Sequence, residues 1–271
     1  MVRPPLEYKA YLIDLDGTVY LGKKALPGAR ETLQTLRELG KRLLFLTNDA
    51  SQRRERIATK LLQMGIPVLV EEILNPSYIA VQYLRQYHPQ SPLLIIGEGD
   101  LHQELREAGL VLCNDPKQVQ VVLVSTDHRF NYRKLKLAFD AIRRGAVFLA
   151  TNADRTYPSQ NGEEMPDTGA IIAALEACTA RHLDVLLGKP ATLMAELALE
   201  MMGLPAEECL LIGDNPETDI RMGNQAGIPT ALVCSGVASH TRPLRPIEEP
   251  TYVFSQLGDL LRSEALYSQD A

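Results

Sequence analysis

The stretch Tyr11-Leu12-Ile13-Asp14-Leu15-Asp16-Gly17-Thr18 joins a short apolar run to two carboxylates and a glycine. The apolar run predicts a buried β-strand. Residues two positions apart on a strand point to the same side, so we expect Asp14 and Asp16 to face one site. Two carboxylates this close repel each other unless a cation lies between them. The pair therefore predicts a hard divalent metal ion, most simply Mg²⁺, with one carboxylate as nucleophile and the other as proton carrier.

Composition and charge narrow the classes of function. Of the 271 residues, 45% are apolar and 23% are charged, as in ordinary globular proteins. The 28 basic and 34 acidic residues give a net charge of −6, which predicts no attraction to nucleic acid or to an anionic membrane through the overall field. The first residues lack the apolar segment of a secretion signal, and no apolar run approaches the ~18 residues of a membrane span.

The cysteines indicate the compartment. None of the four belongs to a CxxC pair, so the sequence predicts no zinc site, and their scatter is typical of reduced thiols in a cytoplasmic protein. They are Cys113, Cys178, Cys209 and Cys234.

Short apolar strands alternate with amphipathic helices along the whole chain, which predicts an α/β fold with mainly parallel sheets covered by helices. After the first strand, which ends near Ile13, we expect strands at 42–46, 93–96, 121–124, 147–149, 209–212 and 230–233. We expect helices from residue 28 to 39, at 53–64, 76–87, from 100 and from 132 onward, and at 169–179, 191–202, 218–226 and 256–262, with a loop over 151–166.

Two breaks in this rhythm predict the domain limits. Two prolines lie within His88-Pro89-Gln90-Ser91-Pro92, and Arg181-His182-Leu183 is interpreted as a return linker. We therefore expect one discontinuous domain built from residues 1–89 and 184–271, and a second domain inserted at 90–183.

Polar groups suited to catalysis occur at four predicted strand ends. They are Asp14/Asp16, Thr47-Asn48, Gly188-Lys189-Pro190, and the segment from Gly213-Asp214 to Asp219. Each alone suits an ordinary turn or helix cap, because Asp, Asn, Thr and Gly favour both. In open α/β sheets, however, ligands bind at the carboxyl ends of the strands. The coincidence of all four at such ends therefore favours a single site.

These motifs resemble those of the haloacid-dehalogenase-like superfamily, in the order Asp14–Thr18, Thr47-Asn48, Lys189 and Gly213–Asp219. Gly188-Lys189-Pro190 and the segment Thr151-Asn152-Ala153-Asp154 narrow the resemblance to the NagD-like branch, subfamily IIA, which includes 4-nitrophenylphosphatases and phosphoglycolate phosphatases. The resemblance implies a Rossmann-like parallel-sheet core with an inserted α/β cap domain of the C2 type.

The resemblance also implies a mechanism. It implies hydrolysis of small-molecule phosphate monoesters through an aspartyl-phosphate on Asp14, with Asp16 as general acid and base. Mg²⁺ would be held by the Asp14 carboxylate, the Asp16 backbone carbonyl and Asp214, and Asp219 would orient metal waters or Lys189. Lys189, Thr47 and the backbone near Asn48 would hold the transferring phosphate.

The resemblance implies that the cap domain selects the substrate. The loop that carries Asp154, Arg155 and Tyr157 would face the leaving group when the cap closes over the site. Asp49 and the segment Pro166-Asp167-Thr168-Gly169 depart from the usual pattern of relatives, at places where substrate choice could differ. A homodimer is compatible with the family.

Three other functions compete with a phosphatase. A carbon–halogen hydrolase of the same superfamily would need neither Asp16 nor a metal, so Asp16 and Asp214 argue against it. A phosphotransferase and a non-catalytic phospholigand-binding protein stay open. The substrate itself stays open among sugar phosphates, phosphoglycolate, nucleoside monophosphates and pyridoxal phosphate, because fold and motifs fix the reaction better than the leaving group.

Overall fold

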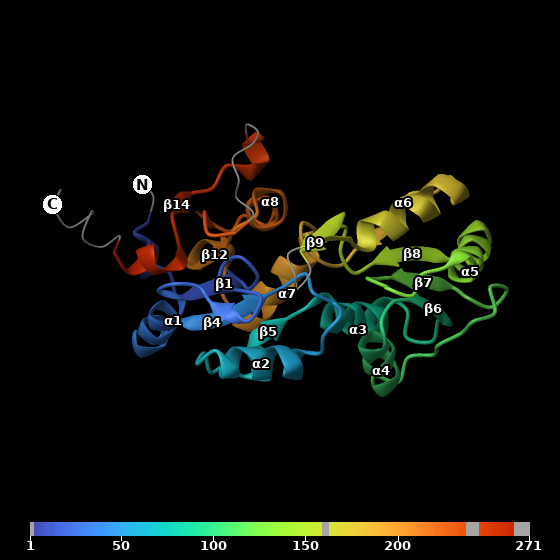
Figure 1. Cartoon of the computed structure of the whole chain (residues 1–271), viewed down its shortest axis with the longest axis horizontal. Helices are drawn as coiled ribbons and strands as arrows, with labels where there is room; N and C mark the ends of the chain where they lie inside the picture. Colours follow the sequence, from blue (N-terminus) through green and yellow to red (C-terminus); the bar gives the residue numbers. More distant parts are fainter. Residues whose placement is uncertain (1–2, 159–162, 237–243, 263–271) are drawn as a thin grey trace. The chain divides into compact units, whose positions relative to one another are not determined.

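The computed structural model describes residues 3–158, 163–236 and 244–262. Two compact units divide the chain (Figure 1). The first unit comprises Met1–Thr47, Glu55–Leu74 and Pro190–Ala271, and the second unit comprises Asn48–Arg54 and Asn75–Lys189. The second unit extends beyond the predicted insert at 90–183, since helix α3 (Pro76–Tyr87) packs against helix α4 (Gly99–Glu107). The roles predicted for the two parts, catalytic core and substrate-selecting cap, stay predictions.

A six-stranded parallel sheet forms the centre of the first unit, with strand order β14-β13-β12-β1-β4-β5. Strand β1 (Ala10–Asp14) lies between β12 (Cys209–Gly213) and β4 (Arg42–Leu46). The outer strands are β13 (Thr230–Val233), β14 (Tyr252–Phe254) and β5 (Ile73–Leu74). All five residues of β1 are buried. The continuous apolar run thus marks a strand covered on both faces.

Helices cover both faces of this sheet. Leu36 of α1 (Ala29–Glu38) and Leu61 of α2 (Arg54–Gln63) share one apolar cluster with Ile13 of β1. On the opposite face, Gly223 of α8 (Arg221–Gln225) approaches the side chain of Leu211. A further helix of this unit is α7 (Leu193–Met202). The predicted α/β class is confirmed for this unit.

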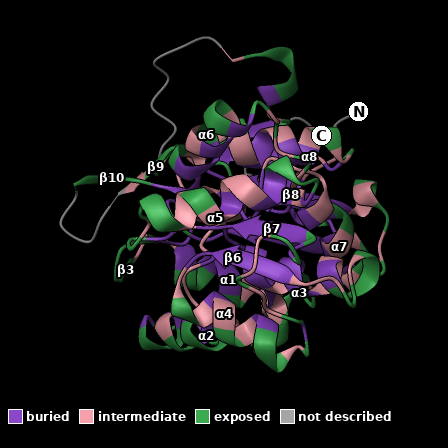
Figure 2. Ribbon diagram, turned by 90° about the vertical axis from the view of Figure 1, so that its right-hand side faces the viewer, coloured by how far each residue is buried: buried purple, intermediate pink, exposed green. Residues whose placement is uncertain are grey.

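The second unit has its own parallel sheet, in the order β11-β8-β7-β6. Its strands are β6 (Leu93–Ile96), β7 (Val121–Val124), β8 (Val147–Ala150) and β11 (Val185–Leu186). Helices α5 (Tyr132–Arg143) and α6 (Thr168–Thr179) pack on one face, and α3 and α4 lie on the other (Figure 1). Figure 2 shows β6 and β7 buried between helices whose outer faces are exposed.

The predicted strands and most of the predicted helices agree with the structure to within about two residues at each end. Asn75 and Asn131 cap α3 and α5 by accepting the backbone N–H groups of Tyr78 and Lys134 at 3.0 and 3.1 Å. Their amide side chains satisfy donors that an α-helix leaves without an internal partner.

One expectation was wrong, and two expected helices are present but are of another helical type over part or all of their length. The predicted loop over 151–166 contains an antiparallel pair, β9 (Thr156–Pro158) and β10 (Glu164–Pro166). The helix expected at 218–226 is a π-helix, Pro216–Ile220, followed by the short α8. The helix expected at 256–262 is a 3₁₀-helix, Leu257–Leu261. Elements of three to five residues show too little periodicity for a pattern to separate them from turns.

Further short elements were not predicted. These are strands β5, β11 and β14, the pair β2 (Tyr20–Leu21) and β3 (Lys24–Ala25), and the 3₁₀-helices Pro5–Glu7, Val70–Glu72, Ala206–Glu208 and Pro246–Glu248. Within the described ranges, no helix combines the length and the apolar character that a membrane crossing needs.

The packing of α1 generates a test of the fold. Leu36 is fully buried in the apolar cluster of the first unit, whereas Leu39 at the end of the same helix is 54% exposed. We expect Leu36→Ala to lower the free energy of unfolding by about 2–5 kcal/mol, because it removes buried methyl groups and leaves a cavity. Leu39→Ala is the control and should change it by less than about 1 kcal/mol. Urea unfolding followed by circular dichroism measures both, and equal effects would contradict this packing.

Candidate active site

An acidic cluster lies at the carboxyl edge of the first unit's sheet. Asp14 ends β1, Asp214 directly follows β12, and Asp219 lies on the π-helix Pro216–Ile220. Because β1 and β12 are parallel neighbours, their carboxyl ends meet at one edge. One carboxylate oxygen from each of the three lies within 4.8 Å of the others. The three residues are buried, with exposed fractions of 5%, 3% and 1%.

The chemistry of this donor set fits a hard divalent cation. Burial and mutual repulsion both raise the free energy of three neighbouring carboxylates, and a bound cation removes both penalties. The donors are all carboxylate oxygens, which Mg²⁺ and Ca²⁺ prefer, and the cluster contains no histidine or thiol that would favour a softer metal. Asp14, Asp214 and Asp219 are therefore three side chains that could hold Mg²⁺.

Glycines make room for two of these carboxylates. A Cβ on Gly17 or on Gly236 would overlap the Asp214 carboxylate, and one on Gly213 would overlap Asp219. Gly17 also has φ +87°, a left-handed conformation that side chains other than glycine rarely adopt. The backbone thus passes within contact distance of the acidic cluster because these positions carry no side chain.

Asp16 is held separately from the cluster. It is exposed, and its Oδ2 accepts the Tyr20 hydroxyl at 2.9 Å. Its predicted role as a metal ligand concerns its backbone carbonyl and stays a prediction. Sequence reasoning missed Tyr20, since an aromatic residue in a short strand gives no signal beyond that of the core.

Thr47 follows β4, the other neighbour of β1. The register pairs Asp14 with Leu46, so Thr47 comes one residue beyond the strand end that carries the nucleophile candidate. Thr47 is 3% exposed, and its backbone N–H donates to the Leu74 carbonyl at 3.1 Å. The first unit therefore brings Asp14, Asp214, Asp219 and Thr47 to one sheet edge.

Within the second unit, Asn48 links segments far apart in the sequence. Its Oδ1 accepts the Lys189 N–H at 2.9 Å, and its Nδ2 donates to the Lys189 carbonyl at 3.1 Å and to Asp154 Oδ2 at 2.9 Å. Asn152 donates to the Asn48 carbonyl at 3.0 Å. The Asn48 side chain is thus engaged with protein groups, and it fixes the backbone of Lys189.

The cap-loop candidates differ in their surroundings. Arg155 is exposed, whereas Tyr157 is half-buried and its hydroxyl lies 2.5 Å from Nε2 of His128. Burial raises the pKa of the Tyr157 phenol above its ordinary value, and nearby carboxylates add to the rise. The phenol therefore keeps its proton at neutral pH. His128, like Tyr20, was not predicted from the sequence.

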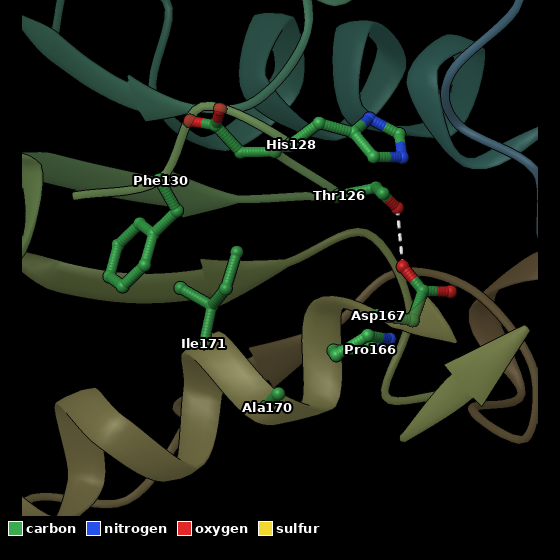
Figure 3. Close-up of a pocket in the computed structure, with 8 residues that line it drawn as sticks. Thr126, His128, Phe130, Pro166, Asp167, Ala170 and Ile171 are labelled. Carbon is green, nitrogen blue, oxygen red and sulfur yellow. Dashed lines mark hydrogen bonds between the residues drawn. The ribbon is translucent and has the colours of Figure 1, made fainter. Parts of the chain in front are cut away.

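A cavity of about 190 Å³ lies beside this loop, between the end of β7 and the start of α6 (Figure 3). Phe130 and Ile171 form part of its apolar wall, and Thr126, His128 and Asp167 are among its polar lining residues. The Thr126 hydroxyl donates to the Asp167 carboxylate (Figure 3). This carboxylate also caps α6 by accepting the Thr168 N–H at 2.7 Å.

Comparisons with known proteins identify the family of this chain. Residues 11–111 match the family model described as haloacid dehalogenase-like hydrolase, and residues 186–260 match the HAD-hydrolase-like model. Sugar-phosphatase AraL of Bacillus subtilis is 36% identical over 258 residues, which are 95% of this chain and 94% of that protein. The chain belongs to the haloacid dehalogenase-like hydrolases.

Solved structures of relatives extend the likeness to the whole fold. A p-nitrophenyl phosphatase from Archaeoglobus fulgidus is 33% identical and superposes with a TM-score of 0.87, covering 96% of this chain and 99% of that one. A glycerol phosphate phosphatase from Mycobacterium tuberculosis, solved in complex with magnesium, is 30% identical with a TM-score of 0.85, covering 96% and 78%. The resemblance stated from the motifs is confirmed.

Asp14, Asp214, Asp219 and Lys189 fall inside the matched segments, 11–111 and 186–260. Neither family model matches residues 112–185, which hold His128, Asp154, Arg155 and Tyr157. The family models therefore cover the acidic edge of the first unit and do not cover Asp154, Arg155 and Tyr157.

The glycine contacts generate a test of the metal site. We expect Gly236→Ala to weaken Mg²⁺ binding at least about tenfold, because the new Cβ must displace the Asp214 carboxylate. Calorimetric titration with Mg²⁺ measures the dissociation constant, and Gly99→Ala is the control since a Cβ there meets nothing within 4 Å. Equal dissociation constants for Gly236→Ala and the wild type would show that Asp214 does not bind the ion.

Proposed function

We propose that this haloacid dehalogenase-like hydrolase is a phosphatase that hydrolyses small-molecule phosphate monoesters through an aspartyl-phosphate on Asp14. The observation that carries the proposal is the buried cluster of Asp14, Asp214 and Asp219, which fits a divalent cation beside a carboxylate nucleophile. The names of the relatives support the class of reaction, because a sugar-phosphatase, a p-nitrophenyl phosphatase and a glycerol phosphate phosphatase are among them.

The reaction would proceed in two displacements. A carboxylate oxygen of Asp14 attacks phosphorus and the bond to the leaving oxygen breaks, while Asp16 gives its proton to the departing alcohol. Asp16 then takes a proton from water as that water attacks phosphorus, which releases phosphate and restores the Asp14 carboxylate. Two easier steps replace one difficult step, as covalent catalysis allows.

Asp14 and Asp16 have different surroundings, which suit the roles of nucleophile and proton carrier respectively. Asp14 is buried in the acidic cluster, where a nucleophile can be held at a fixed distance from the phosphate. Asp16 is exposed, and its carboxylate is oriented by the Tyr20 hydroxyl. A group that exchanges protons with both the leaving alcohol and water needs both properties. A bound Mg²⁺ would neutralise charge that otherwise repels the phosphate from Asp14.

Further residues would bind the phosphate. We infer that Lys189, with its backbone fixed by Asn48, supplies a positive charge to the phosphate oxygens. Thr47 and the backbone N–H groups near Asn48 would donate further hydrogen bonds. In this proposal Asn48 acts as a positioning residue.

We also propose a division between domains. Residues 1–89 and 184–271 would carry the chemistry, and residues 90–183 would form a cap that selects the substrate through Asp154, Arg155 and Tyr157. The relatives named above act on different phosphate esters by their names, so we expect the cap and not the acidic cluster to set the preference. The scattered cysteines support a cytoplasmic location.

Replacement of the nucleophile tests the reaction. We expect Asp14→Asn to lower kcat by roughly 10³-fold or more, because an amide cannot form the phosphoenzyme. The measurement is phosphate release from 4-nitrophenyl phosphate with Mg²⁺, alongside thermal unfolding to show that the variant is folded. Asp140→Asn, which alters a surface carboxylate paired with Lys136, is the control. Near-normal turnover by Asp14→Asn would refute the nucleophile assignment.

Replacement of the proton carrier tests the second role. We expect Asp16→Asn to lower kcat by ~10²–10⁴-fold for an alkyl phosphate, because the poor leaving group needs the proton. The first turnover forms the phosphoenzyme and does not depend on its later hydrolysis. In that turnover the loss of rate should be smaller for 4-nitrophenyl phosphate, since nitrophenolate leaves without protonation. Single-turnover kinetics on both substrates measures this, and an equal loss on the two would remove Asp16 from the role of general acid.

A further inference from the structure

Tyr20 links the proposed proton carrier to a lysine on a neighbouring helix. Its hydroxyl donates to Oδ2 of Asp16 at 2.9 Å, and Nζ of Lys60 lies over its ring, 3.8 Å from the centroid. Lys60 belongs to α2, and all three residues lie within the first unit. One tyrosine thus contacts a cation through its ring and a carboxylate through its hydroxyl.

We propose that Tyr20 and Lys60 are positioning residues for Asp16, which hold its carboxyl group in the orientation that delivers a proton to the leaving oxygen. Lys60 acts through Tyr20, and Tyr20 keeps its own proton throughout. The bond that breaks is the one between hydrogen and Oδ1 of Asp16, and the bond that forms joins this hydrogen to the leaving oxygen. The inference rests on the proposed phosphatase function and deepens it, because it names the groups that set the geometry of the general acid.

The turn after β1 brings Asp16 and Tyr20 together. The Gly17 N–H donates to the Tyr20 carbonyl at 2.8 Å. The N–H groups of Val19 and Tyr20 both donate to the Leu15 carbonyl, at 2.8 and 3.2 Å. Asp16 and Tyr20 also form a β-bridge. The backbone of the turn therefore fixes the position of the phenol relative to the carboxylate.

The surroundings of the Tyr20 ring restrict its orientation. Tyr20 is 3% exposed and belongs to the apolar cluster that contains Ile57 and Leu61 of α2. Lys60 follows Ile57 by three positions and directly precedes Leu61, so it lies beside the face of the helix that packs on this cluster. Its half-buried side chain can pack its methylene groups along the apolar surface while the ammonium lies over the ring.

The Lys60 ammonium is directed to the ring and not to a carboxylate. Among the described residues, no acidic group forms an ion pair with Lys60. Lys136 differs in this respect, because it lies over the Phe139 ring at 5.6 Å and also pairs with Asp140 at 2.5 Å. The contact of Lys60 with Tyr20 is therefore the shorter of these two lysine–ring contacts and does not compete with an ion pair.

The cation and the carboxylate act on the hydroxyl in the same direction. A cation over an aromatic face attracts electron density from the ring, which makes the phenolic O–H a stronger donor. Asp16 becomes a carboxylate as it gives up its proton, and hydrogen bonds to carboxylates are stronger than those to neutral acids. The contact from Tyr20 therefore strengthens as the proton moves, which stabilises the transition state more than the bound substrate.

The experiment compares two esters of similar shape whose leaving groups differ. The rate constant of phosphoenzyme formation is measured in single turnovers with 4-nitrophenyl phosphate and with phenyl phosphate, in the presence of Mg²⁺. Phenolate is the poorer leaving group, so its departure depends more on a donated proton. We expect Tyr20→Phe to raise the ratio of the 4-nitrophenyl phosphate rate to the phenyl phosphate rate about 10-fold, since it removes a hydrogen bond to a charged group.

Variants of Lys60 keep or remove the charge. Lys60→Met removes the cation and should raise the same ratio about 2- to 5-fold. Lys60→Arg keeps a cation for the ring and should stay within about 2-fold of the wild-type ratio. The double variant Tyr20→Phe with Lys60→Met should raise the ratio no further than Tyr20→Phe alone, because Lys60 acts through the hydroxyl.

Two controls separate positioning from stability. Tyr11→Phe removes another hydroxyl of the first unit, which donates to the Pro5 carbonyl at 2.9 Å, and should lower thermal stability while the ratio keeps its wild-type value. Lys136→Met removes the cation over Phe139 in the second unit and should also leave the ratio unchanged. Thermal unfolding of each variant measures its stability alongside the kinetics.

The outcomes separate this inference from the proposed function. If Tyr20→Phe slows both esters equally, or if Tyr11→Phe raises the ratio as much, the Tyr20 hydroxyl only stabilises the fold and the inference is overturned. A wild-type ratio in Lys60→Met overturns it as well, and in each of these cases the phosphatase function stands. If the wild-type protein hydrolyses neither ester with Mg²⁺, the proposed function itself fails, and this inference fails with it.

Discussion

Three carboxylates buried within 4.8 Å of one another impose the main constraint on this molecule. Burial and mutual repulsion both raise the free energy of carboxylates held this close together. The sheet nevertheless brings Asp14 and Asp214 to adjacent strand ends, and glycines at 17 and 236 leave space for the Asp214 carboxylate. The local backbone, including the left-handed φ of Gly17, is thus adapted to a charge arrangement that a bound divalent cation would stabilise.

Much of this edge could be predicted from the sequence because parallel strands follow simple rules. The apolar runs at 10–14 and 209–213 are buried on both faces, so they are recognisable without knowledge of their partners. Once two such strands are adjacent and parallel, the residues that follow them meet at one edge. The positions of Asp14, Asp214 and Thr47 at this edge therefore follow from pattern and topology.

The side-chain links of the second unit could not be predicted in the same way. Asn48 contacts Asp154 and Lys189 across 106 and 141 residues, and His128 contacts Tyr157 across 29. Such pairs depend on loop conformations that no periodicity encodes. The strands β9 and β10, three residues each, were missed for the same reason, and they carry Tyr157. An asparagine in a loop predicts a cap or a turn, and its actual partners emerge from the tertiary fold.

The proposed catalytic residues and the proposed substrate-selecting residues lie in different segments of the chain, and this has a consequence for substrate specificity. The acidic residues and Lys189 lie in segments that match the family models, whereas His128 and Tyr157 lie in 112–185, which neither model matches. Chemistry that must place a nucleophile, a proton carrier and a cation within a few ångströms tolerates little variation. A hydroxyl that recognises the leaving group can be moved or replaced without disturbing that arrangement. Relatives with one reaction and different named substrates are what this separation leads us to expect.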